Sequence, residues 1–144
     1  MVAPTTGKLK AIIDEIATQL DTVDNLRVYK YPADSVQEFP AAIIQDNRAT
    51  NQTVVAEYRA TSPQAVYHLE VVVLVHLADE QAAYEEMEKY TSADSPSSVK
   101  ALMNNAIVAG VQIIECTKAE PRRRYNLGGA SLWGCSFWIR ATVT

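Results

Sequence analysis

Hydrophobic residues recur along the first part of the chain with the period of an α-helix. They fall three or four positions apart over residues 5–22, and charged or amide side chains fill most of the positions between them. This pattern predicts an amphipathic helix, and we expect Thr5 or Thr6 to cap its first turn. The expected buried face consists of Leu9, Ile12, Ile13, Ile16, Leu20 and Val23.

Two prolines then bound a loop between two short strands. Residues 27–31 have the composition of a strand that Pro32 ends, and the loop 33–39 contains residues that favour turns. After Pro40, the small apolar residues 41–45 predict a buried strand.

A long polar stretch, residues 46–64, contains one β-prone segment at 53–58. We expect an extended arm or hairpin that projects from the core, because loops of this length in compact domains are usually functional or disordered. The apolar side chains on such an arm favour a partner surface, although burial against their own sheet would explain them as well. The arm residues that we consider for an interface are Arg48, Val54, Val55, Tyr58 and Arg59.

The clearest strand pattern follows at residues 66–77. Every odd position is apolar, while the even positions include His68, Glu70 and His76. This alternation predicts a strand with one fully buried face. The buried positions would be Tyr67, Leu69, Val71, Val73, Val75 and Leu77.

Two further helices are predicted by their capping residues. Asp79 precedes a helical pattern over residues 80–90, and Ser95 with Pro96 suits the start of a third helix that Gly110 ends. The residues expected to face inward are Ala83, Met87, Tyr90, Val99, Leu102, Met103 and Ala106.

The last third of the chain predicts two strands, 111–117 and 131–143, joined through a polar turn at 118–124. Apolar side chains alternate along the final strand, which is typical of a half-buried antiparallel strand. The order of elements predicts an α+β fold, with a mostly antiparallel sheet covered by helices. A chain of 144 residues suits a single domain, residues 1–144.

Composition and charge exclude several classes of protein. The longest apolar run, residues 71–75, is far shorter than a membrane span, and no signal-peptide pattern opens the sequence. The formal net charge of −4 argues against tight binding to nucleic acid. Cys116 and Cys135 lack metal-ligand spacing and suit buried reduced thiols, although a disulfide between neighbouring strands stays open.

No residue pattern predicts catalysis, a cofactor or a metal. His68 and His76 lie eight positions apart on one strand, roughly 26 Å, which is too far for one metal ion. The carboxylates of residues 79–88 suit a solvated helix face, and Gly128 with Gly129 suits a turn or bulge because no phosphate-binding residues follow. We therefore expect the protein not to be an enzyme.

The only dense basic cluster is Arg122, Arg123 and Arg124, followed by Tyr125. One interpretation is a solvated turn, because three charges supply little affinity for phosphate at physiological salt. The other is an electrostatic contact with an acidic patch on a neighbouring subunit or another protein, since arginine is favoured at interfaces. Both interpretations stay open at this point.

Four phrases of the chain, taken in order, resemble the tail-terminator and neck proteins of long-tailed bacteriophages. The first, LRVYKYPADSVQEFPAAII, follows the leading helix, and the family version often has two prolines where this chain has Pro32 and Ala33. Together the phrases span nearly the whole chain. The other three are YHLEVVVLVHLADEQAAYEEMEKY, SADSPSSVKALM and YNLGGASLWGCSFWIRATV.

The resemblance implies a virion structural protein that is assembled in the bacterial cytoplasm. Such a protein forms a ring, commonly a hexamer, that caps the tail tube, ends its polymerisation and joins it to the neck or head-completion protein. DNA passes through the ring without specific binding. The alternatives are another head–tail connector or tail-completion protein and, from another class, a small cytoplasmic ligand-binding or enzyme domain.

Overall fold

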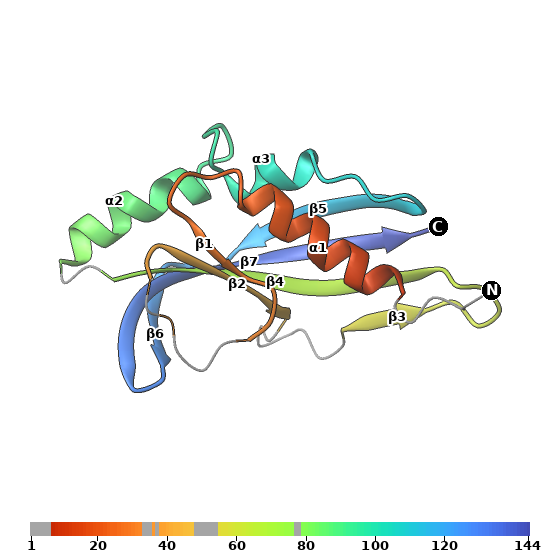
Figure 1. Cartoon of the computed structure of the whole chain (residues 1–144), viewed down its shortest axis with the longest axis horizontal. Coiled ribbons are helices and arrows are strands. Elements are labelled where there is room, and N and C mark those ends of the chain that lie inside the picture. Colours follow the sequence, from red (N-terminus) through yellow and green to blue (C-terminus); the bar gives the residue numbers. More distant parts are fainter. Residues whose placement is uncertain (1–6, 33–35, 37, 48–54, 77–78) are drawn as a thin grey trace.

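Three helices lie on one side of a strongly curved sheet of seven strands in the computed structural model, which describes residues 7–32, 36, 38–47, 55–76 and 79–144 (Figure 1). The predicted α+β fold with a mostly antiparallel sheet is confirmed. The elements are α1 (Lys8–Leu20), β1 (Arg27–Tyr29), β2 (Ala41–Asp46), β3 (Ala56–Tyr58), β4 (Ala65–Val75), α2 (Glu80–Thr91), α3 (Val99–Asn104), β5 (Val111–Ala119), β6 (Arg123–Leu127) and β7 (Ala130–Val143).

The sheet is organised around the two long strands β4 and β7. The strand order is β1-β2-β4-β7-β5, while β3 pairs with the first residues of β4 and β6 pairs with the first residues of β7. All pairs are antiparallel except β1 with β2, which is parallel. The strands β5 and β6 therefore follow one another along the same side of β7.

The main core lies between the sheet and the helices. Alternate residues of β4 and β7 face the helices, so that Leu69 lies beside Ile139 and Val71 beside Phe137. Each of these side chains is at most 2% exposed, and burying one stabilises the fold by roughly 1.5–3 kcal/mol. The helices contribute Ile12, Ile16, Leu20, Ala83, Met87, Tyr90, Val99, Leu102 and Met103 to the same core.

A smaller cluster fills part of the opposite face of the sheet. Ile43, Val72, Leu74 and Leu132 form it, and side chains that include Tyr29, Phe39, Tyr125 and Leu127 pack against it. Nearby, the buried carboxylate of Glu70 accepts hydrogen bonds from Gln45 Nε2 and Ser136 Oγ, each at 2.6 Å. The centre of β4 is thus buried on both faces, which explains why residues 71–75 form an unbroken apolar run.

Two predicted helix boundaries differ from the structure. The first helix begins at Lys8 with Gly7 as its N-cap, and Thr5 and Thr6 lie outside the described residues. The third helix was expected to begin at Ser95 and continue to Gly110, which is wrong. Residues 95–98 form a turn instead, and Ser98 caps the six-residue α3 by accepting the Ala101 N–H at 3.4 Å.

The predicted polar turn at 118–124 is also wrong, because most of it is strand. The strand β5 continues to Ala119, and the arginine-rich stretch begins β6 at Arg123. The pair Gly128 and Gly129, at φ 56° and 83°, then turns the chain into β7, as expected for a glycine turn. Packing of Tyr125 against the second cluster and pairing with β7 outweigh the weak strand propensity of the charged residues.

None of the described helices is both long enough and apolar enough to cross a membrane.

Candidate interaction surface

The three consecutive arginines do not form one cluster, because β6 begins at Arg123 and its register directs Arg123 and Arg124 to opposite faces of the sheet. Arg124 lies opposite Trp133, on the face that the helices cover. Arg123 lies opposite Gly134, and its neighbour in alternation is Tyr125, which packs on the other face. The sequence brought the three charges together, whereas the strand separates them.

Two of the arginines stack on aromatic rings beside α2. The guanidinium of Arg122 lies 4.2 Å from the centroid of the Tyr84 ring, and that of Arg124 lies 4.5 Å from the Trp133 ring. The two rings meet edge to face, with centroids 5.6 Å apart and an interplanar angle of 86°. Arginine, tyrosine, tryptophan and arginine therefore form a continuous row, in which each cation–π contact contributes about 0.5–2 kcal/mol.

Hydrogen bonds hold this row in place. Arg122 Nη1 donates to the carbonyl oxygen of Tyr84, and the Tyr84 hydroxyl donates to the carbonyl oxygen of Arg122, both at 3.4 Å. Arg124 Nη1 donates to Ser131 Oγ at 3.3 Å. The first two bonds fasten α2 to the segment between β5 and β6, and the third joins β6 to β7, so the aromatic and cationic groups keep a fixed arrangement.

The third arginine is held in the same manner on the opposite face. The guanidinium of Arg123 lies 4.0 Å from the centroid of the Tyr125 ring. Tyr125 is half-buried against the second cluster, and this burial raises its pKa to about 12, so the phenol stays neutral at physiological pH. On this face of the sheet, the half-buried Tyr125 ring therefore supports the exposed guanidinium of Arg123.

None of these three charges is neutralised by a carboxylate of the described residues. No Asp or Glu oxygen in the ranges given above lies within 4.0 Å of Arg122, Arg123 or Arg124. An aromatic ring contacts only the flat face of a guanidinium, whereas the N–H donors of the guanidinium point outward in its own plane. Arg122 and Arg124 already donate one N–H each, to Tyr84 and Ser131, so Arg123 is the guanidinium that is most free to bind a carboxylate of another molecule.

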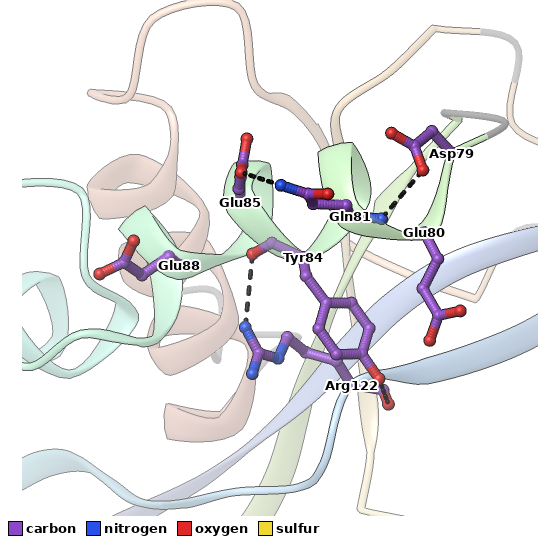
Figure 2. Close-up of a pocket in the computed structure, with 7 residues that line it drawn as sticks. All are labelled: Asp79, Glu80, Gln81, Tyr84, Glu85, Glu88 and Arg122. Atoms are coloured by element: carbon purple, nitrogen blue, oxygen red, sulfur yellow. Dashed lines mark hydrogen bonds between the residues drawn. The ribbon is translucent and has the colours of Figure 1, made fainter.

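The first turns of α2 form an open hollow with the opposite charge (Figure 2). Asp79 caps the helix by accepting the Gln81 N–H at 3.2 Å, and Gln81 Nε2 donates to Glu85 at 3.1 Å. We call this feature the acidic hollow. Its lining residues are Asp79, Glu80, Gln81, Tyr84, Glu85, Glu88 and Arg122.

The acidic hollow holds four carboxylates against one guanidinium. Among the ion pairs of the described residues, the only one on α2 joins Lys89 to Glu86 at 2.7 Å, and Glu86 lies outside the hollow. The four carboxylates of the hollow belong to exposed residues. An excess of exposed, unpaired negative charge in a concave surface suits a cationic side chain of a partner.

The reactive residue types elsewhere in the described part of the chain are engaged in the fold. Burial raises the pKa of both Cys116 and Cys135 to about 11, and both are free thiols. His68 Nε2 lies 2.6 Å from Glu57, whereas His76 packs against a phenylalanine ring, so the two histidines have different partners. No three His, Cys, Asp or Glu side chains in that part of the chain are grouped as metal ligands.

The predicted arm is partly a short hairpin. The strand β3 pairs with β4, Val55 packs against the main core, and Tyr58 is 77% exposed. Tyr58 and Arg59 line a shallow depression with the end of β7, while Arg48 and Val54 lie outside the described residues. Of the arm residues, Tyr58 and Arg59 are thus exposed, and Val55 has a structural role.

The sequence did not indicate the partners of the arginines. Tyr84 lies beside the predicted apolar stripe of α2, and Trp133 is one of the alternating apolar residues of the predicted last strand. The available signal was Tyr84 itself, which lies three residues before Met87 and therefore next to the buried face of the helix. Because β6 was expected to be a turn, nothing connected this row to the arginines.

A scan against protein-family models and a search of curated proteins find no match to this chain.

Proposed function

We propose that this chain is a structural protein of a bacteriophage virion, which forms a ring that caps the tail tube and joins it to the neck. The proposal is supported by the four ordered phrases that resemble the tail-terminator family and by an α+β sheet whose helices cover one face. The single observation that carries it is the presence of preorganised, oppositely charged surfaces around α2 and β6 that the chain does not neutralise itself.

These surfaces suit contact with a macromolecule. Arginine and tyrosine are enriched at protein interfaces, because they combine a large rigid area with polar groups at the edge. Stacking on Tyr84, Trp133 and Tyr125 fixes the guanidinium groups before any partner arrives, which lowers the entropy cost of association. The exposed side chain of Tyr58, at the far end of β4, offers a second point of contact.

Binding to the end of a tail tube tests the proposal. Tail tubes polymerised from the tube protein of the same phage would be imaged with and without this chain, and their lengths measured during assembly. We expect rings at tube ends and growth that stops when the chain is added. Tubes that keep growing with bare ends would overturn the terminator function, and binding only to the head-side neck complex would favour another head–tail connector.

A further inference from the structure

The acidic hollow and Arg123 lie on opposite faces of the same end of the sheet. The hollow is on α2, which packs on the helix-covered face through Ala83, Met87 and Tyr90. Arg123 stacks on Tyr125, which packs on the other face. One surface thus carries unpaired carboxylates, and the opposite surface carries an unpaired guanidinium.

Two different complementary surfaces on opposite sides of a subunit produce a head-to-tail contact. If the two surfaces lay on the same side, a two-fold dimer would satisfy both at once, and assembly would end there. With the surfaces on opposite sides, each copy binds one neighbour through its hollow and another through Arg123. Such a contact closes into a ring when its rotation divides a full turn.

We infer that Arg123 of one copy binds in the acidic hollow of the next copy, head to tail. This inference rests on the proposed ring, and it names the surfaces that join the subunits. The Tyr125 ring supports the guanidinium on one side, and the carboxylates of Glu85 and Glu88 in the neighbouring copy accept its in-plane N–H groups.

Charge exchange tests this contact directly. In Arg123→Glu the hollow stays acidic while the opposite surface becomes acidic too, so copies of this variant repel one another. In Glu85→Lys/Glu88→Lys both surfaces are basic, with the same result. An equimolar mixture restores attraction at every contact, provided that the two variants alternate around the ring.

The assay is the mass of the full chain by light scattering and sedimentation, at about 20 mM and about 500 mM salt. We expect the wild type to associate at low salt and to associate less at high salt, because the Debye screening length falls to about 4 Å at the higher concentration. Each variant alone should lose at least about tenfold in association constant. The mixture should recover it, and native mass spectrometry should find equal numbers of the two variants in each ring.

Lys100→Glu serves as the matched control, because it makes the same change of charge at an exposed position of α3. It should associate like the wild type. The inference is wrong if Arg123→Glu associates like the wild type, if the mixture is no better than either variant, or if the wild type stays a monomer at low salt. Rings of Arg123→Glu that still cap tubes would overturn only the inference, whereas rings joined by this contact that ignore tube ends would overturn only the proposed function.

Discussion

Substituting Gly134 by alanine tests how closely the Tyr125 ring of β6 and the backbone of β4 approach this position of β7. A Cβ at this position would lie 2.8 Å from the carbonyl oxygen of Val73, 2.7 Å from a methyl group of Leu74 and 2.9 Å from the Tyr125 ring. Side chains can rotate away, but the Val73 oxygen belongs to β4, which is paired with β2 and β7 on its two sides, so this oxygen has little freedom to move. Gly134 therefore provides the space in which Tyr125 lies against β4.

The expected cost follows from two opposing effects. Forcing a methyl group into this contact costs about 1–3 kcal/mol, as other overpacked sites do. Replacing glycine stabilises by about 0.4–1 kcal/mol, because the unfolded chain loses conformational freedom. The net loss is about 1–2 kcal/mol, which lowers the melting temperature of a domain of this size by roughly 3–8 °C.

Thermal and urea unfolding, followed by circular dichroism, measure this effect. Gly7→Ala serves for comparison, since a Cβ at Gly7 meets nothing within 4 Å. Because Gly7 is the N-cap of α1, we expect this variant to lose no more than about 0.5–1 kcal/mol, from the weaker cap alone. An alanine at position 134 that leaves stability unchanged or improves it would refute the close approach. The same variant should weaken self-association, because displacement of Tyr125 removes the support of Arg123.

Three further predictions concern buried or paired groups. Tyr90→Phe should leave urea stability unchanged or raise it by about 1 kcal/mol, because the hydroxyl has no partner among the described residues, and a clear loss would contradict this. Cys116 and Cys135 should react slowly with a thiol reagent at about pH 8 until urea unfolds the chain, since burial raises the pKa of both thiols to about 11. The pKa of Asp14 is lowered, first by its hydrogen bond with Lys10, so its stabilising effect is present above the unfolded value of about 3.9 and disappears as the pH falls through the lower folded value. Melting temperatures of Asp14→Asn and the wild type should therefore converge in acid and differ near neutral pH.

Sequence patterns predicted the elements that bury a regular face. The alternation around Val71 and Val73 and along the last strand located β4 and β7, and the period of Ile12, Ile16 and Leu20 located α1. These patterns are local and repeated, because each element packs one face against the main core. The fold class followed from their order along the chain.

Elements held by distant contacts were harder to predict. The strand β6 consists of polar and charged residues apart from Tyr125 and Leu127, so it has no apolar pattern that would predict a strand. It is stabilised by pairing with β7 in a hairpin, which its own residues do not indicate. The parallel pairing of β1 with β2 was equally hard to predict, because the described residues between the two strands form no helix. At the candidate surface, composition revealed the arginines, but their separation onto two faces depends on the register between Arg124 and Trp133.

The position of β7 at the centre of the sheet also has a consequence for the speed of folding. This strand pairs with β4, β5 and β6, and its register with β4 joins Ala65 to Val143 across much of the sequence. Closing such long loops costs entropy before any contact compensates for it, and domains rich in distant strand pairs commonly fold in milliseconds to seconds. On a ribosome the sheet lacks its central strand until β7 has emerged, so the surfaces around β6 can form only after nearly all of this sequence has been translated.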